Sequence, residues 1–205
     1  MRALLVLAGV AVVVYALDQI SKALVVANLP ESRPFPVLGD LLTFQFVRNS
    51  GAAFSLASGS TWIFTVVATA VTVFIVLFAR RIRSTGWAVL FGMLLGGTLG
   101  NLTDRYFREP GFPSGHVIDF LQIPLLPAIF NVADVAIVSS MAVFLILTLR
   151  GVGLDGTRTV EPSGRSAGQP AADPTSGAGA GANAGLDAGT GAAVDTAVDA
   201  DPDRT

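Results

Sequence analysis

Four long apolar runs constrain this chain more than any other feature of its sequence. They cover roughly residues 3–27, 61–79, 86–104 and 127–149. Each run is close to the about 20 residues that a helix needs to cross about 30 Å of hydrocarbon. Because a backbone in hydrocarbon must satisfy its own hydrogen bonds, each run should be helical. The sequence therefore predicts an all-α integral membrane protein with four transmembrane helices.

The first run has an alternative interpretation as a cleavable signal peptide, with Val14-Tyr15-Ala16 as the cleavage site. The apolar run continues past this site to Val26. Its removal would also leave an odd number of spans with conflicting loop charges. We therefore interpret the first run as a permanent transmembrane helix.

The arginines predict how the helices are oriented. Arg80, Arg81 and Arg83 lie between the second and third runs, Arg2 precedes the first run, and Arg150 follows the fourth. Positively charged loops and ends remain in the cytoplasm. Both termini should therefore be cytoplasmic, and residues 28–60 and 105–126 should face outward.

Composition divides the chain at residue 150. Residues 1–150 hold ten Lys/Arg and seven Asp/Glu, a net charge of +3, whereas residues 151–205 hold three and eight, a net charge of −5. The second part is rich in Gly, Ala and Asp and has almost no large apolar side chains, so it cannot form a core. We predict a four-span membrane domain over 1–150 and a disordered cytoplasmic tail over 151–205.

Two local patterns refine this prediction. Leu42, Phe44 and Phe46 alternate with polar residues, which predicts a strand in a small extracytoplasmic β-sheet, and the segment 48–51 is typical of a turn. The third run carries Gly92, Gly96, Gly97 and Gly100. Glycines at helical spacing fit a flexible or kinked helix, but they favour close packing against a neighbouring helix.

Four acids lie in or beside the apolar runs, where ionisable groups are costly and usually functional. Asp18, Asp104, Asp119 and Asp134 all fall near the outer boundary of the membrane in the predicted topology. Lys22 lies one helical turn after Asp18, which fits a structural ion pair. Asp104 is followed directly by a cation, Arg105, so snorkelling or a local ion pair explains it equally well.

Asp119 and Asp134 differ because neither has a cation within four residues along the chain. Two carboxyl groups that meet in low dielectric without a counter-ion cannot both ionise readily, so they hold a shared proton. Aspartic proteases use such a pair to activate water. A proton pathway in a small proton-coupled transporter would use the same residues, so the spacing alone leaves both functions open.

Other kinds of site are disfavoured by what the sequence lacks. It contains no Cys and a single His, which argues against thiolate and His-rich metal sites, a Cys nucleophile and a Ser-His-Asp triad. Its few aromatic residues lie in apolar contexts and do not suggest a nucleic-acid surface. We therefore expect neither such a metal site nor a nucleic-acid partner.

Five motifs together resemble those of the lipoprotein signal peptidases, also called type II signal peptidases. They are Asp18-Gln19-Ile20-Ser21-Lys22, the segments 48–55 (RNSGAAFS) and 96–105 (GGTLGNLTDR), Val117-Ile118-Asp119-Phe120, and Phe130-Asn131-Val132-Ala133-Asp134. They occur in the order found in that family and span residues 18–134. The resemblance does not extend to the tail.

This resemblance implies a membrane aspartic endopeptidase of the bacterial cytoplasmic membrane, with its active site at the extracytoplasmic face. Its substrate would be a diacylglyceryl-modified prolipoprotein, cut just before the lipidated Cys, and globomycin would inhibit it. The resemblance implies no metal and no organic cofactor. The catalytic pair would be Asp119 and Asp134. Substrate-binding or supporting roles would fall on Asp18, Lys22, Asn49, Gly97, Asn101, Asp104, Arg105 and Asn131, with the pairs Asp18–Lys22 and Asp104–Arg105 fixing geometry.

Two alternatives compete with this interpretation. A transporter explains buried acids but not why they gather at one interface, and the inner halves of the spans offer few polar groups. A structural subunit, with the glycine face of the third run as its contact surface, leaves the charged residues unexplained. Cleavage of a lipidated prolipoprotein by a membrane fraction would separate the protease from both.

Overall fold

The computed structural model describes residues 1–51 and 61–158. The end of the second motif, residues 52–55, lies outside these ranges, as does most of the predicted tail, residues 159–205. Residues 151–158, which the sequence assigned to the tail, do have a defined conformation. The backbone N–H groups of Arg83 and Ser84 donate to Leu154 O at 3.0 and 2.9 Å, and Trp87 Nε1 donates to Val152 O at 2.9 Å.

Within these described ranges, four helices are long and apolar enough to cross a membrane, as the sequence predicts. They are α1 (Arg2–Asn28), α2 (Thr61–Phe78), α3 (Thr85–Phe107) and α4 (Val132–Leu149), and a short 3-10 helix, η1 (Ala79–Arg81), follows α2. The fourth span begins five residues later than predicted. Asn131 is its N-cap, and Phe130 pairs with Leu121 as an isolated β-bridge, so the segment before α4 is extended.

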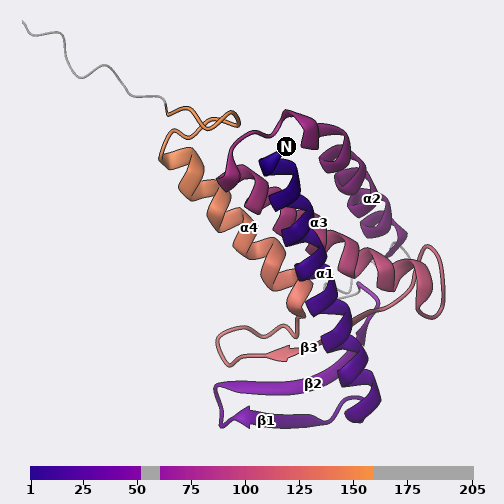
Figure 1. Cartoon of the computed structure of the whole chain (residues 1–205). Coiled ribbons are helices and arrows are strands. Elements are labelled where there is room, and N and C mark those ends of the chain that lie inside the picture. Colours follow the sequence, from indigo (N-terminus) through magenta and orange to yellow (C-terminus); the bar gives the residue numbers. More distant parts are fainter. Residues whose placement is uncertain (52–60, 159–205) are drawn as a thin grey trace, which may run out of the picture. The chain divides into compact units, whose positions relative to one another are not determined.

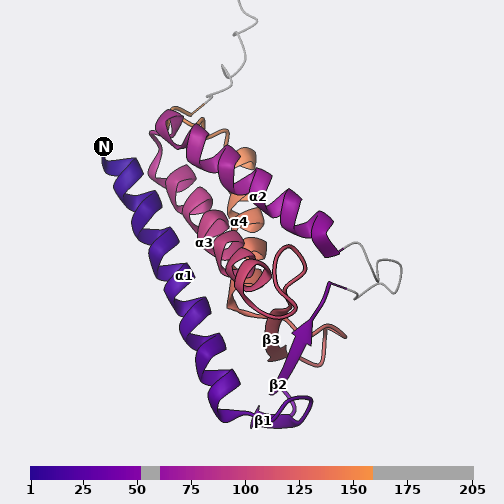
Figure 2. The ribbon, with the colours of Figure 1, turned by 90° about the vertical axis from the view of Figure 1, so that its right-hand side faces the viewer.

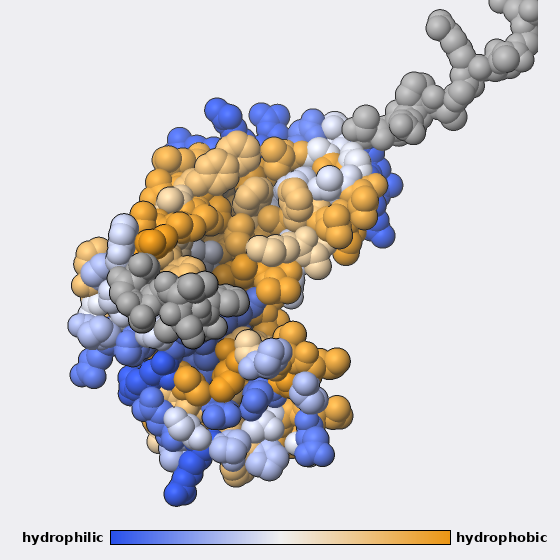
Figure 3. All heavy atoms as spheres, turned by 180° about the vertical axis from the view of Figure 1, so that it is seen from behind, coloured by the Kyte–Doolittle hydropathy of each residue, from blue (hydrophilic) through white to orange (hydrophobic). Residues whose placement is uncertain are grey.

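Helix α3 lies at the centre of the helical part and contacts α1, α2 and α4 (Figures 1 and 2). Half of its span is buried inside the protein, against 17–22% of each other span. The outward surfaces of the other helices remain apolar, and Figure 3 shows a broad hydrophobic surface over this part of the molecule. This pattern suits a multi-pass protein whose helices are surrounded by lipid.

The glycines of α3 allow the backbone of α1 to approach closely. A Cβ at Gly92 would lie 2.7 Å from Leu7 O, and a Cβ at Gly96 would lie 2.6 Å from Ala11 O. Both distances are shorter than any real Cβ contact, so these positions tolerate only glycine without a shift of α1. The predicted close packing of a helix on this glycine face is therefore confirmed.

In the part of the chain that the structure describes, three strands form an antiparallel sheet in the order β1-β2-β3. They are β1 (Pro34–Leu38), β2 (Leu42–Asn49) and β3 (Val117–Gln122). The sheet lies at the end of the helices opposite the connection between α2 and α3 (Figure 2). Its contact with the helical part is a cluster of buried side chains, namely Val25, Phe46, Ile118 and Phe120.

The predicted strand around Leu42–Phe46 is present, but the predicted turn at 48–51 begins too early. Strand β2 continues through Arg48 and Asn49, which pair with Ile118 and Val117 of β3. The pairing with β3 holds this polar stretch in the sheet, an interaction that the local sequence pattern does not reveal. As a result, Asn49 and Asp119 lie on neighbouring strands.

The close packing of α1 on α3 predicts that Gly96→Ala lowers the melting temperature of the purified protein. The new methyl group would overlap Ala11 O, and relieving such overpacking costs about 1–3 kcal/mol. Gly9→Ala is the matched control, because Gly9 lies on α1 and a Cβ at this position would meet no neighbouring atom within 4 Å. An equal melting temperature for both variants would contradict this packing.

Candidate active site

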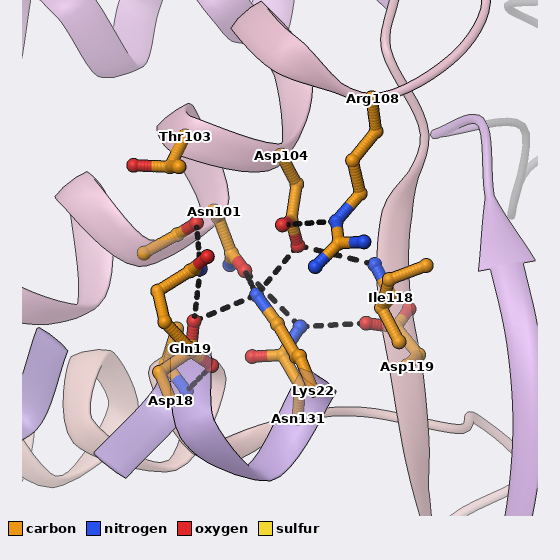
Figure 4. A network of polar contacts seen from close by, with 12 residues as sticks. Asp18, Gln19, Lys22, Asn101, Thr103, Asp104, Arg108, Ile118, Asp119 and Asn131 are labelled. Atoms are coloured by element: carbon orange, nitrogen blue, oxygen red, sulfur yellow. Dashed lines mark hydrogen bonds and ion pairs between the residues drawn. The ribbon is translucent and has the colours of Figure 1, made fainter. Parts of the chain in front are cut away.

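The site is organised around Lys22, whose ammonium group is completely buried. Its Nζ lies 2.8 Å from Asp18 Oδ2, 2.8 Å from Asp104 Oδ2 and 2.9 Å from Asn101 Oδ1. An ammonium group has three protons, so these three acceptors satisfy it completely. Figure 4 shows this amine between the two carboxylates. The predicted Asp18–Lys22 pair is present, and it links α1 to α3.

Asp104 has a second cationic partner, but it is not the predicted one. Its Oδ1 accepts from Arg108 Nε at 2.6 Å, and its Oδ2 also accepts from the backbone N–H of Ile118 at 3.2 Å. The expected Asp104–Arg105 pair is not among the ion pairs of the described residues. Residues four apart share a helix face, whereas adjacent residues do not, which explains why Arg108 is the partner.

Two glycines of α3 make room for these contacts. A Cβ at Gly100 would lie 2.5 Å from Asp18 Oδ2, and a Cβ at Gly97 would lie 2.6 Å from Ala133 O. The N–H of Ala133 in turn donates to Asp18 Oδ1 at 2.9 Å. Gly97 and Gly100 thus bring the start of α4 and the buried ion pair together against α3.

Asp119 lies on β3 and is almost fully buried. Its Oδ2 accepts from Asn49 Nδ2 at 2.7 Å, and its Oδ1 accepts from Asn131 Nδ2 at 2.6 Å. Asp134 lies in the first turn of α4, where its Oδ2 accepts from the backbone N–H of Asn131 at 3.1 Å and its Oδ1 from Asn101 Nδ2 at 2.8 Å. Asn131 therefore binds both carboxyl groups.

The three asparagine side chains are each oriented by a group that can only donate. Asn131 Oδ1 accepts from the backbone N–H of Asp134 at 3.0 Å, and Asn49 Oδ1 accepts from the N–H of Gly51 at 2.7 Å. Asn101 Oδ1 accepts from Lys22. Since each oxygen faces an obligate donor, each NH₂ group faces a carboxyl oxygen of Asp119 or Asp134.

The four acids of the network fall into two kinds. Asp18 and Asp104 are bound by cations, whereas the donors to Asp119 and Asp134 are all neutral amide groups. Within residues 1–51 and 61–158, no ion pair reaches either Asp119 or Asp134. Neutral donors fix the direction of a carboxyl group without requiring that it be ionised.

Burial raises the pKa of Asp119 to about 6. The negative charge of Asp134 adds to this increase in pKa, while the hydrogen bonds from Asn49 and Asn131 and the charge of Lys22 oppose it. Asp119 therefore keeps its proton at a pH where an ordinary aspartic acid is ionised.

Arg105 lies beside the acids without forming an ion pair. Its guanidinium group is packed over the ring of Phe64, with Cζ 5.6 Å from the ring centroid. Its Nη1 is buried and has no hydrogen-bond partner in the part of the chain that the structure describes. This arrangement leaves a cationic donor available next to the network.

An apolar groove of about 350 Å³ runs from this donor along the helices. Asn101 and Arg105 form its polar end. The remaining walls come from α2, α3 and α4 and are formed by Phe64, Val67, Ala68, Val71, Leu94, Thr98, Ile137 and Met141. The groove therefore offers an apolar surface that leads to hydrogen-bonding groups.

The structure brings all the predicted site residues to one end of the helices. Sequence reasoning missed two further members, Gln19 and Arg108. Gln19 Nε2 donates to Asp18 Oδ2 at 3.1 Å and to Gly100 O at 3.0 Å. The spacing of four residues from Asp104 was a signal for Arg108, and Gln19 lies inside the first motif. No group of His, Cys, Asp and Glu suited to a metal ion occurs in the described ranges.

Fold and site together define a multi-pass membrane protein with two carboxyl groups at one end of its helices, the buried one of Asp119 and the partly buried one of Asp134, both hydrogen-bonded by neutral donors. Known proteins of similar sequence and structure fit this description. The sequence model of the signal peptidase (SPase) II family matches residues 10–150.

Two relatives and one solved structure illustrate the similarity. The lipoprotein signal peptidase of Leifsonia xyli subsp. xyli is 68% identical over 156 residues, which are 76% of this chain and 72% of that protein. The lipoprotein signal peptidase of Mycobacterium avium is 48% identical over 75% of this chain and 84% of that protein. A bacterial membrane enzyme solved by the in meso method at 1.9 Å superposes with a TM-score of 0.61 and 26% identity, covering 69% of this chain and 90% of that one. The chain belongs to the signal peptidase II family.

The buried ion pairs predict that Lys22→Gln strongly destabilises the protein. Without the ammonium group, Asp18 and Asp104 lose a buried counter-ion, which costs about 3–5 kcal/mol of unfolding free energy. Arg48→Gln is the matched control, because Arg48 forms an exposed pair with Glu31, and such a pair contributes about 0–1 kcal/mol. Thermal unfolding in detergent measures the difference, and equal stability of both variants would contradict the role of Lys22.

Proposed function

We propose that this chain is a membrane aspartic endopeptidase that removes the signal peptide from diacylglyceryl-modified prolipoproteins, just before the lipidated Cys. The observation that carries the proposal is the pairing of Asp119 and Asp134 through Asn131, with neutral donors on all four carboxyl oxygens. Membership of the signal peptidase II family supports the substrate class. It gives no support to a transporter.

The proposed reaction uses Asp119 as the acid and Asp134 as the base. Protonated Asp119 transfers its proton to the scissile carbonyl oxygen as ionised Asp134 takes a proton from the attacking water, whose oxygen bonds to the carbonyl carbon. The resulting gem-diol then collapses. Its C–N bond breaks as the leaving amine receives a proton from the pair, and the other product is the carboxylic acid of the released signal peptide.

The same residues suggest how a substrate is held. Its apolar part would occupy the groove along α2, α3 and α4, which keeps the scissile bond at the polar end of that groove. The free Nη1 of Arg105 would donate to a backbone carbonyl of the substrate. We expect membrane lipids to surround the helices and globomycin to compete for the same groove.

The proposed location is the bacterial cytoplasmic membrane, with the site at its extracytoplasmic face. Arg2, Arg80, Arg81, Arg83 and Arg150 belong to the ends of helices opposite the sheet, and positive ends remain in the cytoplasm. The sheet and the carboxyl pair would then lie outside, where prolipoproteins present their signal-peptide junction.

Asp119→Asn and Asp134→Asn should each abolish cleavage of a lipidated prolipoprotein. Asparagine preserves the shape of each side chain but removes the proton exchange that the mechanism needs. We expect losses of at least about 10³-fold in kcat, the scale seen when a member of a catalytic unit is removed. Asp40→Asn is the control, because Asp40 is an exposed acid in the turn between β1 and β2. Turnover near the unmodified rate in either dyad variant would overturn the proposal.

The pKa of Asp119 predicts the direction of the pH dependence. As pH rises through about 6, Asp119 loses the proton that the acid step requires, so kcat/KM should fall above this value. Asn49→Ala removes a hydrogen bond that lowers the pKa of Asp119, so the inflection should move to higher pH. A profile that rises through pH 6, or an unmoved inflection in the variant, would contradict the assigned roles.

A further inference from the structure

A polar cavity lies at the end of the helices opposite the carboxyl pair. It has a volume of about 510 Å³ and is lined by three arginines, Arg2 of α1, Arg80 of η1 and Arg83 of the following connection. Three cations from two separate segments therefore border one space. Its size lies in the range of about 300–1,000 Å³ that is usual for ligand sites.

The walls of this cavity are held in place by buried contacts. Ala3 and Ile82, which also line it, are 7% and 3% exposed and belong to the same apolar cluster. The backbone of Arg83 donates to Leu154 O at 3.0 Å, so residues 151–158 fix the connection that carries this arginine. The cavity is thus bordered by a fixed backbone, and the side chains of Arg2 and Arg80 are exposed at its rim.

None of the three arginines forms an ion pair with an acid in the described parts of the chain. Asp155 is the acid whose charge interacts with Arg83, but it is fully exposed and its Oδ1 already accepts two hydrogen bonds from Thr157, at 3.0 and 2.7 Å. The cavity therefore combines several positive charges with unused guanidinium donors. Guanidinium groups bind phosphate well because their N–H groups match its oxygens.

We propose that this cavity binds the phosphate group of an anionic phospholipid. The cavity lies where the apolar helix surfaces end, and Leu4, which also lines it, is 37% exposed beside the 70% exposed Leu5. A phosphate in the cavity would thus have apolar surface next to it for its acyl chains. Figure 3 shows hydrophilic atoms along the rim of the broad apolar surface at this end.

The adjoining apolar surface favours a lipid over a soluble anion. A free phosphate would use only the arginines, whereas a phospholipid would also cover exposed leucines of α1. Basic pockets between transmembrane helices are known to take anionic headgroups. The site is separate from the groove proposed for the substrate, so it would affect stability or lipid preference and not the chemistry of cleavage.

The test compares two double variants of the full chain that lose the same charge at the same end of the helices. Arg80→Gln with Arg83→Gln removes two cations that line the cavity. Arg81→Gln with Arg150→Gln removes two that do not, since Arg81 lies over the ring of Phe78 and Arg150 is the C-cap of α4. Native mass spectrometry would count retained phosphatidylglycerol and, separately, phosphatidylcholine with the same acyl chains.

We expect the unmodified chain to retain phosphatidylglycerol in preference to phosphatidylcholine. The cavity variant should lose about 30-fold in this preference, because it lacks two cations that each provide about 1 kcal/mol of attraction, and the control should keep it. Equal losses in the two variants would mean general surface charge and would overturn the proposal. So would full displacement of the lipid by inorganic phosphate. If phosphatidylglycerol were retained only by a chain truncated after Arg158, the acidic C-terminal segment would be the occupant of the cavity in the full chain. This result would also overturn the proposal.

Discussion

The ammonium group of Lys22 is the contact on which the arrangement of the site depends. Burying one charge in the helical part is costly unless its partners are complete. Lys22 meets this requirement by binding Asp18 of its own helix and Asp104 and Asn101 of α3. The close approach of α1 to α3, made possible by glycines, is what brings these groups within hydrogen-bond distance. The same contact between α1 and α3 therefore determines both the packing of the apolar helices and the geometry of the polar site.

Asn101 connects Lys22 to the carboxyl pair and orients Asp134. Because its oxygen is bound by Lys22, its NH₂ group must face Asp134 and its oxygen can also accept from Asn131 at 3.1 Å. The cation thus orients the pair through an amide and does not contact it. A direct ion pair would favour the ionised form of Asp119 or Asp134. One amide between cation and acid leaves a carboxyl group free to exchange a proton.

Much of this arrangement could be predicted from the sequence, because hydrocarbon imposes strict rules. The length of the runs predicted four helices, the glycine spacing predicted the face of α3 that contacts its neighbour, and the position of the acids predicted their meeting at one end. Partner choice was harder to predict. Asp104 was expected to pair with Arg105, and it binds Arg108 and Lys22 instead. Strand β3 was also missed, since its pairing with β2 joins segments about seventy residues apart and leaves no local signal.

The late start of α4 shows how such a boundary can matter for chemistry. Had the helix begun at residue 127, Asn131 would lie within it and its backbone N–H would be used by the helix. As the N-cap, Asn131 instead donates its backbone N–H to Asp134 and accepts from the N–H of Asp134 in a capping box. This leaves its NH₂ group to bind Asp119 and Asn101. The interaction that ends the extended segment and begins the helix is the same one that joins the two acids, so fraying of the first turn of α4 would separate them.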